Sequence, residues 1–320
     1  MEKVPAAGYE IEGMWISGLQ RRLTWENLIF PFKVISSLIK SRKILKRFRP
    51  QVVVGVGGYA SGPMLRAATS RKIPSLIQEQ NSYAGLTNKI LSKQADRICV
   101  AYDHMEKYFP YEKIVVTGNP VRKDIEHLES KRQQALDHFN LDQKKITVLV
   151  TGGSLGARTI NESILKGLKL FKKTGLQLIW QAGSFYYKDI SEAVAEMDVD
   201  NVQLYEFINE MDLAYSAADV VVARAGALTI SELCLAGKPA ILIPSPNVAE
   251  DHQTKNAKAL VAEDAAQLVT DRDAQKNLAT EVLNLVADTL LREKLGENIK
   301  KLGRPHAAED IAKEVIKLAG

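Results

Sequence analysis

The sequence predicts an α/β protein with two Rossmann-like, doubly wound parallel-sheet domains that face a cleft. Short β-rich segments alternate with longer amphipathic segments, which is the pattern of parallel sheets built from βαβ units. A charged segment without a strand pattern divides these units into two series. The 320 residues are also enough for about two domains with ordinary cores.

The first series contains four expected strands, at residues 51–56, 74–78, 97–101 and 113–118. The second contains five, at residues 145–153, 176–183, 201–207, 219–224 and 239–245. Between them, the charged residues 122–143 are expected to form an interdomain linker. We therefore assign residues 1–121, together with a C-terminal helix over 305–320, to the first domain and residues 144–304 to the second.

Composition excludes several classes of protein. Hydrophobic residues make up 46% of the chain and charged residues 25%, as in soluble globular proteins. No apolar run approaches the roughly 18 residues of a membrane-spanning helix, and the first residues lack the apolar core of a signal peptide. Cys99 and Cys234 each lie in an apolar run, which favours buried thiols over a disulfide or a metal site.

Positive charge is concentrated near the start of the chain. Residues 21–50 contain nine Lys or Arg and one acid, whereas the whole chain has a net charge of +5, so the remainder is net negative. Local basicity of this kind favours one anionic partner surface over nucleic-acid binding. Within this segment, four apolar residues form a stripe that is expected to face the core: Val34, Leu38, Leu45 and Phe48.

The first glycine-rich segment is VVVGVGGYASGP, residues 52–63. It contains Gly55-x-Gly57-x-x-Ala60, with Glu79 about twenty residues later, which matches a dinucleotide-binding fingerprint. Two features weaken that interpretation: Pro63 is well placed as the first residue of a helix, and Glu79 begins a polar loop. The alternative that this loop binds the phosphate of another ligand stays open.

The second glycine-rich segment, VLVTGGSLGARTIN, predicts a strand, a tight turn and a helix that begins at about Ala157. Ser154 stands between glycines, so the loop suits a diphosphate held by N–H groups and one hydroxyl. The same residues match the hydrolase motif G-x-S-x-G, for which Asp219 and His252 or His306 are formal partners. A tight turn that binds nothing is the third alternative.

A third segment, ADVVVARAGALTISE, predicts a strand that ends in Arg224 and a helix that begins at Thr229. Ser231 and Glu232 then fall in the first helical turn, where a carboxylate complements the helix dipole. A carboxylate beyond the carboxyl end of a parallel strand is also where α/β proteins bind the diol of a sugar. Both interpretations of Glu232 stay open from these residues alone.

Six segments, in order and spacing, resemble the bacterial MurG family of glycosyltransferases: GVGGYASGP, EQNSYAGLTN, TGNPVR, TGGSLGARTIN, RAGALTISE and EDHQTKNA. The resemblance covers residues 1–320 and implies a GT-B fold whose C-terminal domain holds the donor. It implies inverting transfer of N-acetylglucosamine from UDP-N-acetylglucosamine to the C4 hydroxyl of undecaprenyl-diphospho-N-acetylmuramoyl pentapeptide. This step converts lipid I to lipid II in peptidoglycan synthesis, with no cofactor or metal besides the donor.

The resemblance also implies residue roles. The donor-binding residues would be Asn81, Arg122, Ser154, Ile208, Ala227, Leu228, Thr229, Ile230, Ser231, Glu232, His252 and Gln253. Among these, Ser154 would contact the diphosphate, Ile208 the uracil and Glu232 the ribose, with Asn81 and Arg122 reaching the donor from the N-terminal side. The acceptor diphosphate would lie against Gly57, Gly58, Tyr59, Ser61 and Gly62.

A lipid-linked acceptor implies a membrane surface, so the basic segment becomes a candidate for contact with anionic lipid on the cytoplasmic face of the plasma membrane. The expected membrane residues are Trp25, Leu28, Ile29, Phe30, Phe32, Lys33 and Lys40. The alternative is an ordinary amphipathic helix with a solvated charged face. Other cell-wall synthesis proteins are further candidate partners, and nucleic acid is not.

The sequence departs from the family pattern at three places. Gln78 stands where the family often has histidine, and His252 replaces the first glutamine of a frequent pair. The family also opens with a strand and a glycine-rich loop ending in histidine; we expect that unit to be absent here, which leaves the catalytic base unassigned. The open alternatives are a UDP-N-acetylglucosamine epimerase, a glycolipid glucosyltransferase and a non-catalytic nucleotide-sugar-binding subunit.

Overall fold

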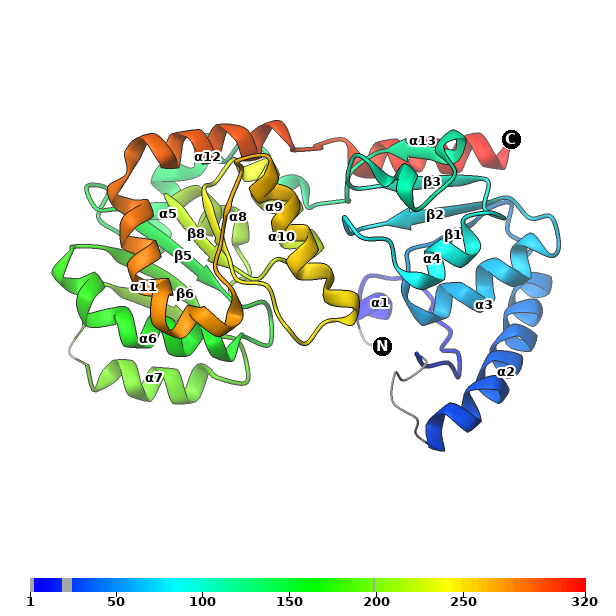
Figure 1. Ribbon diagram of the computed structural model, residues 1–320, viewed down its shortest axis with the longest axis horizontal. Coiled ribbons are helices and arrows are strands. Elements are labelled where there is room, and N and C mark those ends of the chain that lie inside the picture. Colours follow the sequence, from blue (N-terminus) through cyan, green and yellow to red (C-terminus); the bar gives the residue numbers. More distant parts are fainter. Residues whose placement is uncertain (1–2, 19–24, 198) are drawn as a thin grey trace. The chain divides into compact units, whose positions relative to one another are not determined.

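The computed structural model describes residues 3–18, 25–197 and 199–320, apart from the side chains of residues 3 and 25–27 (Figure 1). The chain divides into two compact units. The first comprises Met1–Thr117 and Glu309–Gly320, and the second comprises Gly118–Ala308. Each unit is a parallel α/β sheet covered by helices, as the alternation of strand and helix patterns predicts.

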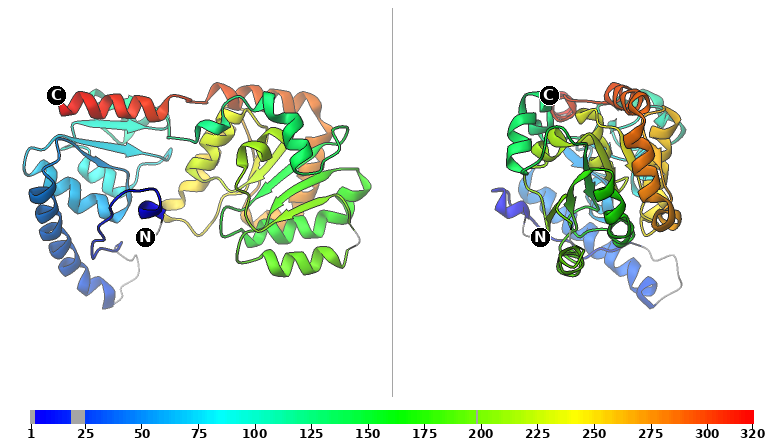
Figure 2. Two further views of the ribbon diagram at one scale, coloured as in Figure 1. Left: turned by 180° about the vertical axis from the view of Figure 1, so that it is seen from behind. Right: turned by 90° about the vertical axis from the view of Figure 1, so that its left-hand side faces the viewer.

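The sheet of the first unit contains four parallel strands in the order β1-β2-β3-β4. These are β1 (Val53–Gly55), β2 (Ser75–Glu79), β3 (Arg97–Val100) and β4 (Ile114–Val116). The other elements are α1 (Lys3–Ala6), α2 (Trp25–Phe48), α3 (Gly58–Thr69), α4 (Leu86–Leu91), η1 (Met105–Lys107) and η2 (Tyr111–Lys113). Helices α3 and α4 lie on one face of the sheet, and α13 (Ala307–Ala319) runs along the other (Figures 1 and 2).

Helix α2 buries a narrow face. Ser37, Ser41 and Leu45 follow one another at four-residue spacing and are all buried, so they form the face that packs on the unit. The expected core stripe is therefore only partly correct. Phe48 is 76% exposed, because the helix ends at this residue and its side chain does not reach the core.

The sheet of the second unit contains six parallel strands in the order β10-β9-β8-β5-β6-β7. They are β5 (Thr147–Thr151), β6 (Gln177–Gln181), β7 (Val202–Tyr205), β8 (Val220–Ala223), β9 (Ala240–Leu242) and β10 (Gln267–Leu268). The chain first builds outward from β5 through β6 to β7, then returns to pair β8 on the other side of β5. This reversal places a topological switch point between β5 and β8, where open α/β sheets bind ligands.

Helices of the second unit cover both faces of this sheet (Figure 1). They are η3 (Lys123–Ile125), η4 (Leu128–Lys131), α5 (Arg132–His138), α6 (Arg158–Lys173), α7 (Tyr187–Ala195), α8 (Met211–Ala217), α9 (Ala227–Ala236), η5 (Ala249–Asp251), α10 (His252–Ala262), α11 (Asp271–Ala287) and α12 (Thr289–Lys301). The side chains of β5, β6 and β8 are buried, as expected for strands covered on both faces.

Residues 122–143, expected to be a linker, instead fold onto the second unit as η3, η4 and α5. Lys131 forms an ion pair with Asp212 at 2.7 Å, and Arg132 forms one with Asp219 at 2.9 Å. Buried Ile125, Leu128 and Leu136 explain why the segment packs despite its many charges. Most charged residues of this segment lie on its solvent-exposed side, and its apolar residues pack against the second unit.

Candidate functional site

The strands of the second unit end in one row. Tyr205, Gln181, Thr151, Ala223 and Leu242 are register partners across β7, β6, β5, β8 and β9. Because all strands are parallel, the segments that follow them emerge at the same edge of the sheet. This edge brings together Ser154, Ile208, the start of α9 and the start of α10, which include most of the sequence-predicted donor residues.

The loop after β5 is held by close backbone packing. Gly156 has φ +85°, and a Cβ on this residue would lie 2.1 Å from the Ala182 carbonyl oxygen. Its neighbour Gly183 has φ +85°, and a Cβ there would lie 2.0 Å from the Gly156 nitrogen. Only glycine allows this approach. The packing leaves Ser154 exposed at the tip of the turn, before α6 begins.

Gln181 connects this loop to the segment after β7. Its amide donates to the Gly153 carbonyl at 3.1 Å, and its Oε1 accepts from the Ile208 N–H at 2.9 Å. Ile208 is 3% exposed, so its side chain lies in the core and its N–H is already bonded. A ligand contact by Ile208 would therefore use its carbonyl. Gln181 was not among the predicted residues, because its sequence position looks like an ordinary strand end.

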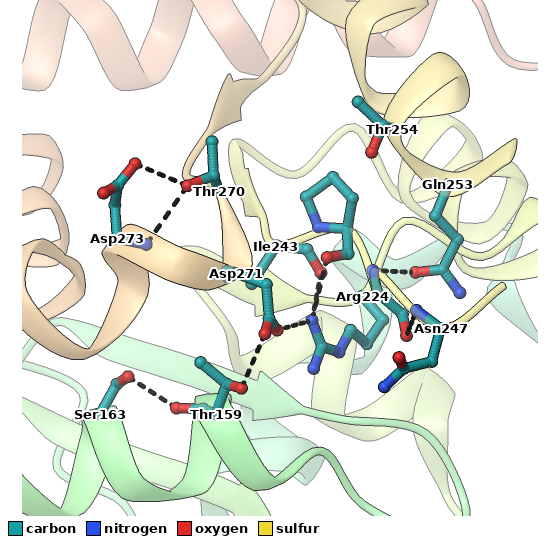
Figure 3. Close-up of polar contacts among 12 residues, drawn as sticks. Thr159, Ser163, Arg224, Ile243, Asn247, Gln253, Thr254, Thr270, Asp271 and Asp273 are labelled. Atoms are coloured by element: carbon teal, nitrogen blue, oxygen red, sulfur yellow. Dashed lines mark hydrogen bonds and ion pairs between the residues drawn. The ribbon is translucent and has the colours of Figure 1, made fainter. Parts of the chain in front are cut away.

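Arg224 organises the ends of β8 and β9 (Figure 3). Its guanidinium donates to the carbonyls of Ile243 and Pro244 at 3.1 Å and to Asp271 at 2.5 Å. Asp271, the first residue of α11, also accepts from the Thr159 hydroxyl in the first turn of α6. Arg224 and Asp271 therefore connect α6, α11 and the ends of β8 and β9 through hydrogen bonds.

Helix α9 begins at Ala227, two residues earlier than the sequence suggests. Its N-cap is Gly226, and no described side chain caps it. Ala227, Leu228 and Thr229 thus occupy the first turn, where unpaired N–H groups favour an anion. Ile230 is buried at 2% exposure, so any contact it makes with a ligand would come from its backbone.

The earlier helix start moves Glu232 into the second turn, beyond the strongest influence of the helix dipole. Its Oε2 accepts from the Tyr215 hydroxyl at 3.0 Å, and its Oε1 lies 3.8 Å from Arg122 Nη2. Burial raises the pKa of Glu232, while the Tyr215 hydrogen bond and Arg122 act in the opposite direction. Ser231 accepts a hydrogen bond from Asn119 at 3.0 Å, which anchors the segment that carries Arg122.

Arg122 belongs to the second unit, not to the N-terminal side from which it was expected to reach the donor. The motif TGNPVR therefore contributes Asn119 and Arg122 to the surroundings of α9. Asn119 was not among the predicted site residues.

The start of α10 carries the two expected sugar-binding residues. Gln253 Oε1 accepts from the Ser245 N–H at 2.8 Å, as Figure 3 shows, which leaves its amide nitrogen to donate. His252 Nδ1 lies 2.8 Å from the Ala249 carbonyl, so this nitrogen carries the proton and Nε2 is left for a ligand. Glu250 and Asp251, which precede them, both adopt positive φ.

The hydrolase interpretation of Ser154 does not agree with this arrangement. Asp219 precedes β8 and accepts from the N–H of Thr147, the first residue of β5. Ser154 follows the last residue of β5, so the strand length separates the two side chains. The described residues also contain no group of three His, Cys, Asp or Glu side chains that could hold a metal ion.

In the first unit, the glycine loop follows β1. Gly57 and Gly58 have φ +84° and +74°, and α3 begins at Gly58 rather than at Pro63. The left-handed glycines let the chain enter the helix early. Ser61 is buried, and its hydroxyl donates to the Gly57 carbonyl at 2.6 Å. Tyr59 is 59% exposed, and Gly62 packs near Thr87.

Glu79 ends β2 and holds the segment that contains Asn81. One carboxylate oxygen accepts from the Asn81 N–H at 3.1 Å, and the other accepts from the Gly85 N–H at 2.9 Å and from Asn88 at 2.8 Å. Its side chain is 3% exposed. These bonds occupy the carboxylate, which is why it is not the ribose acceptor that a dinucleotide site requires.

The exposed face of α2 differs from the expected membrane residues. Leu28, Phe32, Ile35 and Ile39 share one helical face and are 63%, 67%, 56% and 49% exposed. Lys33 and Lys40 instead reach back to the preceding segment, where they donate to Ser17 and to the Gly13 carbonyl. Ile29 is 45% exposed and Phe30 is half-buried.

Trp25 begins α2, but its side chain lies outside the described residues, as do Arg21 and Arg22. Within the described helices, none is both long and apolar enough to cross a bilayer.

Two family models match the chain. Residues 147–315 match the glycosyltransferase family 28 C-terminal domain, and residues 1–100 match the glycosyltransferase family 28 N-terminal domain. A relative from Christiangramia forsetii is 52% identical over 318 residues, covering 99% of this chain and 86% of its own. A relative from Bacteroides fragilis is 52% identical over 321 residues, covering 100% and 84%. Both are named UDP-N-acetylglucosamine–N-acetylmuramyl-(pentapeptide) pyrophosphoryl-undecaprenol N-acetylglucosamine transferase.

Solved structures show the same fold. The crystal structure of MurG from Acinetobacter baumannii matches with a TM-score of 0.78 and 27% identity, covering 98% of this chain and 87% of that chain. A UDP-GlcNAc 2-epimerase from Neisseria meningitidis, bound to UDP-GlcNAc, matches with a TM-score of 0.63 and 18% identity, covering 93% and 83%. The second likeness concerns the fold alone.

Proposed function

The chain belongs to glycosyltransferase family 28, and we propose that it transfers N-acetylglucosamine from UDP-N-acetylglucosamine to undecaprenyl-diphospho-N-acetylmuramoyl pentapeptide. The observation that carries this proposal is the 52% identity, over 99% of the chain, to a relative named for that reaction. A base takes the proton of the acceptor's C4 hydroxyl as the hydroxyl oxygen attacks the anomeric carbon with inversion, and the bond to UDP breaks.

The donor is assigned to the carboxyl edge of the second unit. Ser154 and the N–H groups at the starts of α6 and α9 bind the diphosphate, because helix N-termini favour anions. The Ile208 carbonyl contacts uracil, and Glu232 accepts from the ribose hydroxyls. Gln253 and His252, at the start of α10, donate to or accept from the hydroxyls of N-acetylglucosamine.

The acceptor diphosphate is assigned to the loop Gly57–Gly62 at the start of α3 in the first unit. The same physical argument applies, since Gly57 and Gly58, which both have positive φ, are the N-cap and the first residue of a twelve-residue helix. Because backbone N–H groups stabilise the leaving UDP in this scheme, we expect a chelator such as EDTA to leave the transfer rate unchanged. A rate that disappears with EDTA and returns with Mg²⁺ would contradict this part.

The exposed apolar face of α2 is assigned to the cytoplasmic membrane surface. Arg42, Lys43 and Lys46 are exposed on the same helix, and each cation near anionic lipid contributes about 1 kcal/mol. Sedimentation with anionic liposomes should therefore exceed that with neutral liposomes and fall with salt. Phe32→Ser with Ile39→Ser should reduce binding, whereas Tyr111→Ser, at an 80% exposed residue away from α2, should not. Equal sedimentation of both variants would contradict the assignment.

Acceptor-dependent release of UDP tests the function. With UDP-N-acetylglucosamine, lipid I should accelerate UDP release and give one disaccharide-lipid per UDP, whereas diacylglycerol and water should not. Equal turnover with diacylglycerol would indicate a glycolipid glycosyltransferase. An epimerised UDP-sugar formed without acceptor would indicate an epimerase, and donor binding without any turnover would indicate a binding subunit.

A further inference from the structure

Tyr215 is a fully buried tyrosine whose hydroxyl contacts a single carboxylate. It lies on α8, is 0% exposed, and donates to Glu232 Oε2 at 3.0 Å. Burial, followed by the negative charge of Glu232, raises its pKa well above 10, so the hydroxyl stays protonated and remains a donor. The strand β8 separates the two residues in sequence, and the fold brings α8 and α9 together at this point.

The second oxygen of Glu232 faces a different environment. Arg122 Nη2 lies 3.8 Å from Oε1, and the Arg122 side chain is 49% exposed, so this contact is solvated and long. Tyr215 is therefore the rigid partner, and Arg122 is the adaptable one. The Glu232 side chain itself is 18% exposed, which gives a ligand access to the remaining lone pairs.

A carboxylate binds a ribose diol only when it is held in a particular orientation. The 2′ and 3′ hydroxyls of the ribose must both donate to acceptors in a fixed geometry, whereas a free glutamate can adopt many rotamers and would lose entropy on binding. The helix dipole supplies no such orientation, since Glu232 lies in the second turn of α9. A donor that is immobile because it is buried can fix the carboxylate plane before the ligand arrives.

We propose that Tyr215 is a positioning residue for the donor ribose, which holds the Glu232 carboxylate in the orientation that binds the 2′ and 3′ hydroxyls. This inference rests on the proposed function, because it takes UDP-N-acetylglucosamine as the donor. It assigns to Tyr215 no contact with the ligand.

The test compares the Kd of UDP with that of 2′,3′-dideoxy-UDP by calorimetry on the full chain. In the wild type, the dideoxy compound should bind about 10–100-fold more weakly, as expected for hydrogen bonds to a charged group. In Tyr215→Phe this ratio should fall below about 3-fold, because the carboxylate is no longer oriented for the diol. Glu232→Ala, which lacks the carboxylate, sets the lower limit of the ratio.

Cys234→Ala is the matched control for a merely structural effect. Cys234 is buried on the same helix α9, and its removal should lower the melting temperature while leaving the wild-type ratio unchanged. A Tyr215→Phe ratio equal to that of the wild type would overturn the proposal.

If Tyr215→Phe does not fold, the wild type gives the answer by ¹³C NMR of the tyrosine Cζ atoms. The Tyr215 signal should shift with UDP and not with the dideoxy compound, and equal shifts would overturn the proposal. Failure of the proposed function is a separate result: a chain that binds no UDP, or turns over no lipid I. A wild type that transfers to lipid I but does not distinguish the two nucleotides would overturn this inference alone.

Discussion

Glu79, the last residue of β2, and Glu232, in the helix that follows β8, are carboxylates near the carboxyl ends of parallel strands, yet Glu79 is buried and Glu232 is partly exposed. Glu79 accepts hydrogen bonds from Asn81, Gly85 and Asn88, and its side chain is 3% exposed. Glu232 accepts a hydrogen bond from the Tyr215 hydroxyl at 3.0 Å, and its Oε1 lies 3.8 Å from Arg122 Nη2. A carboxylate surrounded by protein donors holds a loop together, whereas one with a single firm partner has lone pairs left for a ligand.

The largest effect is expected for Glu79→Ala. Its loss leaves the N–H groups of Asn81 and Gly85 and the Asn88 amide without their acceptor, at about 3 kcal/mol or more in total. Hydrogen exchange of the amides in β2 and β3 should then accelerate by about 100-fold or more, while UDP affinity in the folded protein stays within about 2-fold. Unchanged exchange rates would remove the distinction between the two carboxylates.

Glu232→Ala should show the opposite behaviour. UDP affinity should fall by about 1.5–3 kcal/mol through loss of charge-assisted hydrogen bonds. Exchange in the second unit should accelerate less than Glu79→Ala accelerates it in the first, because only the Tyr215 hydroxyl loses its acceptor. Calorimetric titration measures this loss, and Glu263→Ala, which removes an exposed acid after α10, is the control for charge alone. If a folded Glu232→Ala protein binds UDP with wild-type affinity, the assignment of Glu232 to the ribose is wrong.

The ionisation of Glu232 is expected to have a smaller effect, which is on thermal stability. Because burial raises the native pKa of Glu232 above its ordinary 4.5, its stabilising contribution is complete below pH 4.5 and is lost as the pH rises through the native value. Glu232→Gln does not ionise and can still accept from Tyr215. It should therefore melt at a higher temperature than the wild type at pH 7, and the difference should shrink towards pH 4. A wild type that melts higher at pH 7 would contradict this.

Much of the fold could be predicted because strand and helix patterns are local. The nine expected strands are present, and within the part of the chain that the structure describes only β10, a two-residue strand, was missed. The linker over 122–143 was mistaken because composition does not reveal that Ile125, Leu128 and Leu136 are buried beneath the charges. Likewise, Phe48 fits a helical stripe in sequence, but the helix ends there.

Ser154, Thr229 and Glu232 could be expected at one edge because parallel strands end together. The residues that support them, Tyr215 and Gln181, could not be predicted from the sequence. Tyr215 lies in an apolar run typical of a core helix, and Gln181 lies at a strand end, so neither has a local signal of its role. Lys33 and Lys40 were expected at a membrane because they lie in a basic segment beside apolar residues and the resemblance implies a lipid-linked acceptor. Their hydrogen-bond partners, Ser17 and Gly13, are distant in sequence and could not be predicted.

The steady-state kinetics of transfer to lipid I, with UDP-N-acetylglucosamine varied, test most directly the claim that the second unit binds the donor through Glu232. In Glu232→Ala, the KM for the donor should rise by about 10-fold or more, because ribose hydrogen bonds form in both the ground and transition states, and kcat should stay within about 3-fold. An unchanged KM, or a loss confined to kcat, would contradict the account.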